Sequence, residues 1–294
     1  MKKMLVIMNP YAGTRQANKY LAGILDIFCK GGYEVRIAMT QRAGDGIKLA
    51  AEHARENDIL VAIGGDGTFN EVVAGMFKSG ADIPIGYVPG GTTNDFAASV
   101  GLSTSALEAA EGIVSGRKQR YDIGKFNGRY FSYVASFGAF TSTSYNVPQD
   151  LKNMIGHAAY VLSGITDVVN IKPLHLKVTN GDTTYEDDYI FGAICNSTSM
   201  GGIINLKPSD VDMKDGLFEV MLIKEPKDPI DFSNIILGLS TTVQGNEMFE
   251  YFRASELKFQ MPKTAPWTCD GEEAKHKDGV IHIRNLKDAL TIYK

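Results

Sequence analysis

Two glycine-rich loops, each placed directly after a short apolar run, constrain the fold of this chain more than any other feature. The first loop covers residues 64–68 and reads Gly-Gly-Asp-Gly-Thr, and the second covers residues 89–95 and reads Pro-Gly-Gly-Thr-Thr-Asn-Asp. Each loop leads into a segment with helical character. A strand, a glycine-rich turn and a helix in that order leave unpaired N–H groups at a helix N-terminus, where a phosphate group can bind.

Each loop also carries an aspartate, Asp66 in the first and Asp95 in the second. A bare carboxylate repels phosphate unless a divalent cation or a proton lies between them, so the pair suggests a metal–nucleotide complex. A single Gly-Asp-Gly is also a common turn sequence, and neither loop fits the dinucleotide or the P-loop pattern. Two such loops at the ends of neighbouring strands favour phosphate binding over plain turns.

Strand and helix patterns alternate in the first part of the chain, which predicts an α/β domain with a doubly wound, mostly parallel sheet. Strands are expected at residues 4–8, 34–39, 59–63 and 83–88, and helices at residues 17–30 and 47–56 and from Ser105 to about 116. Ser105 and Glu108 have the spacing of a capping box. Ligands bind at the carboxyl ends of such strands, where both glycine loops and a turn at residues 9–13 fall.

The pattern changes after about residue 121, where β-rich segments predict a mostly antiparallel, sandwich-like domain. Strands are expected at residues 131–137, 174–178, 189–195, 217–223, 257–261 and 280–283, and helices at residues 155–169 and 230–243. The last apolar segment, residues 289–293, could return to the first domain as a strand. We therefore expect a first domain of residues 1–121 joined by 286–294, and a second of residues 122–285.

The composition excludes several classes of function. The formal net charge is −4 without a basic run, which argues against a nucleic-acid partner. The three cysteines lie far apart, which suits reduced thiols and gives no metal-site spacing. No apolar run reaches transmembrane length, and none resembles a signal peptide. We expect a cytoplasmic protein, peripheral and reversible in any membrane contact, and the sequence leaves open whether it forms a homodimer.

Two further acidic turns lie in the second domain. Asp270 and Glu272 are two residues apart, so they share a face in extended structure, and such a pair suits general-base chemistry. An acidic surface turn explains the same residues without function. The turn at residues 212–217 offers side-chain and carbonyl oxygens to a hard cation such as Mg²⁺, although an ordinary Asp-Gly hairpin turn is the simpler explanation of these residues.

Taken together, these motifs resemble those of the diacylglycerol kinase catalytic family, which also includes sphingosine and ceramide kinases. The resemblance is carried, in the family's order, by residues 9–13, 64–68, 89–97, 121–124, 215–218 and 270–272. It implies a two-domain kinase that uses ATP and Mg²⁺ to phosphorylate a lipid hydroxyl at a membrane interface. Diacylglycerol, giving phosphatidic acid, is the leading acceptor. A kinase of another lipid or of NAD is the alternative, and a nucleotide-binding regulator without catalysis is the least favoured.

The same resemblance implies a nucleotide site in the first domain. The residues expected to hold ATP are Asn9, Pro10, Tyr11, Ala12, Gly13, Thr40, Gly65, Asp66, Gly67, Thr68, Phe69, Asn70, Glu71 and Thr92. An acidic network of Asp66, Asp95 and Asp122 is expected to surround the catalytic Mg²⁺.

For the second domain, the resemblance implies that Asp270 or Glu272, with Glu272 preferred, accepts the proton of the substrate hydroxyl. It also implies a structural Mg²⁺ held by Asp215 and by main-chain oxygens of Asp212 and Leu217. Phe137, Phe140 and Tyr145 are candidates to line an acyl-chain groove, although core packing is the simpler role for them.

Overall fold

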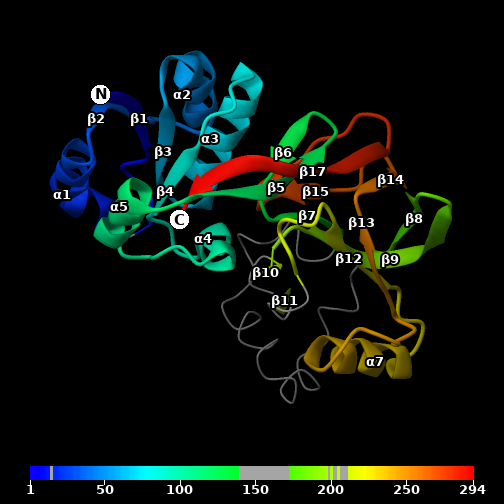
Figure 1. The fold of residues 1–294 in the computed structure, drawn as a ribbon. Helices are drawn as coiled ribbons and strands as arrows, with labels where there is room; N and C mark the ends of the chain where they lie inside the picture. The colour runs from blue at the N-terminus through cyan, green and yellow to red at the C-terminus, as the bar shows by residue number, and fades with distance from the viewer. Residues whose placement is uncertain (14–15, 139–171, 198, 201–203, 206–210) are drawn as a thin grey trace. The chain divides into compact units, whose positions relative to one another are not determined.

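A computed structural model describes residues 1–13, 16–138, 172–197, 199–200, 204–205 and 211–294 of the chain (Figure 1). The helix expected at residues 155–169 lies outside these ranges. The chain forms two compact units, the first of Met1–Ile123 with Leu286–Lys294 and the second of Gly124–Asn285. Along the described parts of the chain, none of the helices combines the length and the apolar composition needed to span a bilayer.

The first unit contains the predicted parallel sheet. Its strands are β1 (Lys2–Met8), β2 (Tyr33–Met39), β3 (Ile59–Gly64) and β4 (Ile85–Pro89), in the order β4-β3-β1-β2, and the end of β17 (Val280–Tyr293) lies parallel to β4. Met4–Met8 and the whole of β3 are buried, because a parallel sheet is covered on both faces. The returning C-terminal strand was predicted, but it is continuous with the strand expected at residues 280–283.

Helices cover both faces of this sheet. They are α1 (Gln16–Lys30), α2 (Asp45–His53), the 3₁₀ turn Ala54–Glu56, α3 (Asp66–Ser79), α4 (Asp95–Val100) and α5 (Ala106–Ser115). Figure 1 shows α1 and α5 together on one side and α2 and α3 together on the other. Ile24 and Phe28 of α1 share a buried core with Met4 and Val6 of β1 and Ile113 of α5. The doubly wound α/β arrangement is therefore confirmed.

The predicted capping box at α5 is wrong. Ser105 does precede the helix in an extended conformation, but its side chain makes no capping hydrogen bond. Instead the Ser103 hydroxyl donates to Glu108 Oε2 at 2.7 Å and accepts a bond from the Ser105 N–H at 3.1 Å. A Ser-Thr-Ser sequence offers several hydroxyls within reach of one glutamate, so spacing alone did not identify the partner.

The second unit is mostly antiparallel β structure, as predicted. Its strands are the end of β5 (Lys118–Phe126), β6 (Arg129–Phe131), β7 (Val134–Gly138), β8 (Leu174–Asn180), β9 (Thr183–Cys195), β10 (Ser199–Met200), β11 (Ile204–Asn205), β12 (Phe218–Lys224), β13 (Phe249–Ala254), β14 (Glu256–Gln260), β15 (Trp267–Cys269), β16 (Glu272–Glu273) and the start of β17. The long strand β9 pairs with β8, β7 and β12, all antiparallel. One helix, α7 (Pro229–Ser240), agrees with the prediction for residues 230–243.

An aromatic cluster around Trp267 forms the centre of the second unit. The Trp267 ring lies 5.1 Å from the ring of Phe126, 4.9 Å from that of Phe137 and 5.1 Å from that of Phe259, measured between centroids. Phe137 is fully buried in this cluster, so it packs in the core and does not line an acyl-chain groove. The other two residues considered for such a groove, 140 and 145, lie outside the described ranges.

Candidate active site

Three turns meet at the carboxyl ends of the parallel strands of the first unit. The Asn9 N–H donates to the carbonyl of Ile63 at 2.9 Å, and the Gly90 N–H donates to the carbonyl of Gly64 at 2.6 Å. These main-chain bonds join the turn after β1 to the end of β3, and the end of β3 to the loop after β4. Main-chain hydrogen bonds therefore join the ends of these strands.

Glycine is required in these turns because backbone packs directly on backbone. A Cβ atom at Gly13 would lie 2.2 Å from the carbonyl oxygen of Gly90, and one at Gly91 would lie 2.7 Å from the Cα of Gly65. Gly13 also has a φ of +50°, a backbone conformation that residues other than glycine rarely adopt. The result is a cradle lined by main chain, the type of surface that approaches a phosphate group closely.

Asp66 connects the two glycine loops. The residue is 9% exposed, and its side chain accepts bonds from the Asp95 N–H at 3.0 Å, the Phe96 N–H at 3.4 Å and the Thr93 hydroxyl at 3.3 Å. The carboxylate of the first loop thus receives the N–H groups that begin α4 after the second loop. Burial raises the pKa of Asp66, and these hydrogen bonds oppose that rise by stabilising the ionised form.

Asn94 fixes the second loop, a role that the sequence analysis missed. It has a φ of 53°, its Oδ1 accepts the Gly91 N–H at 2.9 Å and its Nδ2 donates to the Gly91 carbonyl at 3.1 Å. The buried Tyr87 hydroxyl donates to the same Oδ1 at 3.4 Å. Asparagine tolerates this left-handed backbone better than most residues, and that preference was the available signal.

Glu71 contacts a helix N-terminus. Its two carboxylate oxygens accept the N–H of Gly44 at 2.7 Å and the N–H of Gly46 at 2.8 Å, at the start of α2. A carboxylate is favourable there because the helix dipole and the unpaired N–H groups both attract negative charge. Glu71 therefore ties α3 to α2, a contact that could not be read from the motif.

The remaining residues expected to hold ATP lie in or next to the same turns. Asn9 Oδ1 accepts the Tyr11 N–H at 3.0 Å, and the Thr40 N–H donates to the Met8 carbonyl at 2.9 Å. The Phe69 ring is fully buried and stacks on Tyr87, so this residue can offer only main chain to a ligand. The others expected there are Pro10, Ala12, Gly13, Gly65, Gly67, Thr68, Asn70 and Thr92, which belong to the turn after β1, to α3 with its preceding residue, and to the loop after β4.

Asp122 is fully buried, and its Oδ1 accepts the N–H of Asp288, a residue of β17, at 2.8 Å. It therefore holds the C-terminal strand against β5 within the first unit. Within the described ranges, no three or more His, Cys, Asp or Glu side chains are grouped so that they could hold a metal ion. The structure thus gives Asp66 and Asp122 separate main-chain partners.

In the second unit, the turn from β15 to β16 gives Asp270 and Glu272 different surroundings. Asp270 is 8% exposed and has a φ of 52°, and Gly271 follows with a φ of 80°. The Asp270 carboxylate accepts N–H bonds from Ser132 at 2.6 Å, Tyr133 at 3.0 Å and Val134 at 3.0 Å. Glu272 is exposed and its Oε2 lies 2.6 Å from Arg129 Nη2. The turn therefore separates the carboxylates that an extended strand would place side by side.

In the turn expected to hold a structural Mg²⁺, the carboxylate of Asp215 is already paired with a positively charged side chain, that of Arg253. Asp215 accepts the Leu217 N–H at 2.8 Å through Oδ1, and its Oδ2 pairs with Arg253. Arg253 also bonds to Glu219, which is 1% exposed, and burial raises the pKa of Glu219 to about 7. Asp212 contributes its main-chain oxygen to the Asp215 N–H at 3.4 Å. Because a guanidinium already neutralises Asp215, the described residues do not fit a divalent cation here.

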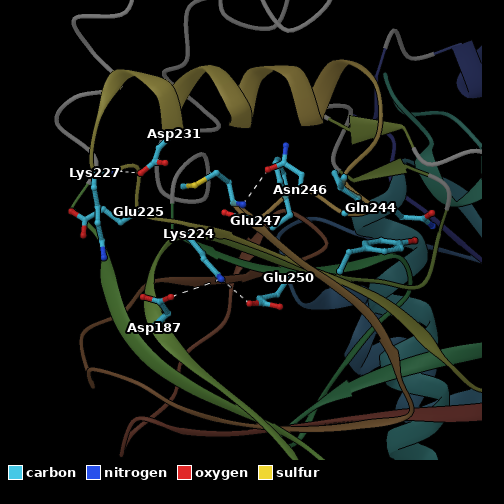
Figure 2. A pocket seen from close by; sticks show the side chains of 14 residues that line it. Asp187, Lys224, Glu225, Lys227, Asp231, Gln244, Asn246, Glu247 and Glu250 are labelled. Atoms are coloured by element: carbon cyan, nitrogen blue, oxygen red, sulfur yellow. Dashed lines mark hydrogen bonds and ion pairs between the residues drawn. The ribbon is translucent and has the colours of Figure 1, made fainter.

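A cavity of about 860 Å³ lies elsewhere in the second unit, lined by the turns before and after α7 and by the strands β12 and β13 (Figure 2). On its wall, Lys224 lies 2.9 Å from Glu250 and 4.0 Å from Asp187. Carboxylates outnumber lysines among the lining residues, which disfavours a phosphate-bearing ligand. No residue that the sequence placed in the candidate site lines this cavity.

Comparisons with known proteins agree with the geometry. Residues 3–126 match the family described as the diacylglycerol kinase catalytic domain, and residues 135–291 match the YegS C-terminal NAD kinase beta sandwich-like domain. A diacylglycerol kinase of Bacillus subtilis (strain 168) is 32% identical over 278 residues, which cover 92% of this chain and 90% of the relative. One of Staphylococcus saprophyticus is 32% identical over 225 residues, covering 76% of this chain and 73% of the relative.

Solved structures show the same fold. A proposed diacylglycerol kinase from Bacillus anthracis str. Sterne superposes with a TM-score of 0.81 at 26% identity, covering 99% of this chain and 95% of that one. Another chain from the same organism gives a TM-score of 0.77 at 23% identity over 99% of this chain and 98% of that one. At that identity the second comparison supports the fold alone.

Proposed function

This chain belongs to the diacylglycerol kinase catalytic family and is a kinase of that family, and we propose that it transfers the γ-phosphate of ATP to the free hydroxyl of diacylglycerol, giving phosphatidic acid. The substrate is suggested by relatives named diacylglycerol kinase at 32% identity. The observation that carries the nucleotide assignment is the main-chain cradle of the first unit, in which Asp66 joins both glycine loops.

In this proposal the ATP phosphates bind in the glycine cradle at the N-terminus of α3, where backbone N–H groups supply the contacts. The N–H groups that begin α4 are bonded to Asp66 instead. Neither loop contains a lysine, so the phosphate charge needs another counter-charge. Burial raises the pKa of Asp66, and a cation beside this carboxylate would stabilise its ionised form. Mg²⁺ bound with a nucleotide takes one or two carboxylates together with phosphate and water oxygens, so it needs no cluster of three acidic side chains. Asp66 and Asp95 belong to the two glycine loops and are the carboxylates proposed for this role, whereas Asp122 is bonded to β17. When bound, Mg²⁺ neutralises charge on the transferred phosphoryl group.

We assign proton acceptance from the substrate hydroxyl to Glu272. Its carboxylate is exposed and bonded to a side chain, whereas the Asp270 carboxylate is engaged by three main-chain N–H groups. A general base needs an oxygen that a substrate hydroxyl can reach. In this proposal Asp270 therefore stabilises the turn, and Glu272 accepts the proton of the substrate hydroxyl.

The acceptor in this proposal is a lipid presented at a membrane interface, and the contact with the membrane is peripheral and reversible. The chain has a formal net charge of −4, so binding to anionic lipid by charge alone is weak. We also propose that the protein works in the cytoplasm, where ATP is available. The proposed mechanism does not depend on whether the protein forms a homodimer.

A panel of acceptors in mixed micelles tests the function directly. Diacylglycerol, monoacylglycerol, sphingosine, ceramide and, in solution, NAD are each incubated with radiolabelled ATP and Mg²⁺, and the labelled products are separated. We expect label in phosphatidic acid and loss of the reaction on addition of EDTA. Transfer to NAD and to no lipid would replace the lipid-kinase proposal with the NAD-kinase alternative.

The same assay tests the proposed base. Glu272→Gln is nearly isosteric and should lower kcat by roughly 10²–10⁴, the usual contribution of general-base catalysis. Glu273→Gln is the matched control, because Glu273 lies in the same turn and is also exposed. Equal turnover in both variants and the wild type would remove Glu272 from the mechanism.

A further inference from the structure

We propose that Arg129 is a positioning residue that aims the Glu272 carboxylate at the substrate hydroxyl, an inference that rests on the proposed function. Both residues belong to the second unit. The chain holds the backbone of Arg129 in a hairpin, the Arg129 guanidinium makes two contacts with the acidic turn, and Asp270 holds the same turn.

The backbone of Arg129 is fixed by the β5–β6 hairpin. Arg129 pairs with Phe126 across the hairpin, and Asn127 in the turn has a φ of 50°. The Asn127 N–H donates to the His282 carbonyl at 2.8 Å, and Asn127 Oδ1 accepts the His282 N–H at 3.0 Å, so β17 holds the turn. Phe131, at the end of β6, is 1% exposed. The Arg129 side chain therefore extends from a hairpin whose backbone is bonded to β17.

The Arg129 guanidinium contacts the acidic turn at two points. Nη2 donates to Glu272 Oε2 at 2.6 Å, and Nη1 donates to the main-chain carbonyl of Glu273 at 2.8 Å. The second bond depends on no side-chain rotamer of the turn, so it keeps the guanidinium in place whichever way Glu272 points. A planar, two-donor group of this kind specifies direction as well as charge.

Asp270 holds the same turn from the other side. The three N–H groups that its carboxylate accepts belong to Ser132, Tyr133 and Val134, which follow β6 directly. The segment 129–134 thus engages the turn 270–273 through main-chain bonds at one end and through Arg129 at the other. The backbone of Glu272 is fixed by these contacts, and its side chain is restrained by Arg129.

Glu272 needs this restraint because it is half exposed and its side chain has several rotatable bonds. Its side chain is 52% exposed and that of Arg129 is 38% exposed. The entropy of ordering a free glutamate side chain corresponds to roughly a tenfold change in an equilibrium or a rate. If Arg129 orders the Glu272 side chain before the substrate binds, its removal should lower kcat by about tenfold while nucleotide binding stays unchanged.

A double-mutant cycle separates positioning from general structural support. Arg129→Gln and Arg129→Lys are made in the wild type and in Glu272→Gln, and each protein is assayed for diacylglycerol phosphorylation and melting temperature. We expect about a tenfold loss of kcat for Arg129→Gln in the wild type, with the KM for Mg·ATP within twofold. In the Glu272→Gln background, the same substitution should cause no further loss. Arg129→Lys keeps the positive charge but loses the planar guanidinium with its two donor nitrogens. It should lower the activity in part when made in the wild type and should have no effect when made in Glu272→Gln.

Arg284→Gln is the matched control. Arg284 Nη2 lies 3.0 Å from Glu256 Oε1, an exposed arginine–glutamate pair of the same unit with no part in the proposed site. Adding this substitution should leave kcat unchanged relative to the parent protein, both in the wild type and in Glu272→Gln.

Two results would overturn the inference: an equal fractional loss in both backgrounds, which indicates structural damage, or an unchanged or higher kcat for Arg129→Gln and Arg129→Lys. A higher kcat would mean that the ion pair only occupies the carboxylate. A wild-type protein that phosphorylates none of the lipids would overturn the proposed function itself, and this differs from every result of the cycle.

Discussion

Replacing Asp270 by asparagine should destabilise the second unit by about 3 kcal/mol. The substitution keeps the shape of the side chain and changes one carboxylate oxygen into an amide donor. It therefore tests whether the three N–H groups of residues 132–134 depend on a carboxylate. Because Asp270 is only 8% exposed, water can replace the lost acceptor only poorly.

The magnitude follows from the individual hydrogen bonds. The remaining oxygen of the asparagine can still accept the N–H of Tyr133 and the N–H of Val134, both at 3.0 Å in the wild type. The new amide then faces the Ser132 N–H, which donates to Oδ2 at 2.6 Å in the wild type. The loss of a charge-assisted bond costs about 1.5–3 kcal/mol, and a buried N–H without an acceptor costs about 1–3 kcal/mol. Since these two terms overlap, we expect about 3 kcal/mol in total.

Urea unfolding followed by tryptophan fluorescence measures this change. Trp267 is the single tryptophan of the chain, is 1% exposed and lies on β15, next to the turn. Its emission therefore reports the unfolding of the second unit. The matched control is Asp278→Asn, because Asp278 is exposed and accepts a single N–H, from Val280 at 3.1 Å. The control should change the free energy of unfolding by less than about 0.5 kcal/mol.

Equal unfolding free energies for Asp270→Asn and the wild type would refute the reasoning. That result would mean that the turn needs no carboxylate, and Asp270 would then be available for proton transfer. A loss of similar size in the Asp278→Asn control would refute it in a different way, because the effect would then not depend on the buried bonds.

Three further predictions follow from the described contacts. Asp66→Asn should weaken Mg·ATP binding and lower turnover together, since the carboxylate holds the first N–H groups of α4; calorimetry and the kinase assay measure the two effects, and unchanged affinity would contradict the assignment. Native protein should react with a thiol reagent at Cys29 only, because Cys195 and Cys269 are buried and burial raises the pKa of both thiols; a titration that counts more than one rapid thiol would contradict this. EDTA should leave the melting temperature unchanged, whereas Asp215→Ala should lower it, because Arg253 and not a metal ion neutralises the Asp215 carboxylate. Mg²⁺ that is bound in the wild type and absent from the variant would instead support the metal site that the family resemblance implies.

The fold of the first unit could be predicted from sequence because its information is local. The run Met4–Met8 and the strand β3 are continuously apolar, as strands covered on both faces must be. The glycine loops mark the strand ends, since side chains cannot be accommodated where backbone packs on backbone. Both signals lie within a few residues of the structure that they predict.

Parts of the second unit were not predictable from such signals. The strand β15 has three residues, too few to show alternation, and it exists because it pairs with β7. The strand β13 was missed although it is longer, because its three aromatic residues, one buried and two partly exposed, show no clear alternation. These strands depend on partners that lie far away in the sequence.

The candidate site shows the same limit. Its motifs were visible in the sequence, but the hydrogen-bond partners of their side chains were not. Glu71 caps α2 through glycines 25 and 27 residues away, and Arg129 reaches Glu272 across 143 residues. Arg129 belongs to no motif that the chemistry requires, so only the folded chain brings it to the acidic turn.

The acidic residues of the proposed site differ in the donors that they accept, although Asp66 also accepts one side-chain donor, the Thr93 hydroxyl. The buried ones, Asp66, Asp122 and Asp270, accept main-chain N–H groups, which cannot move away unless the backbone rearranges. Glu272 is exposed, and the partner that fixes it is an arginine side chain. Arg129 bonds to Oε2 of Glu272, so it can stay in place while Oε1 binds a new donor. Glu272 can therefore accept a substrate hydroxyl while Arg129 still holds it and without loss of local structure, which is the property that a proton acceptor at a membrane interface needs.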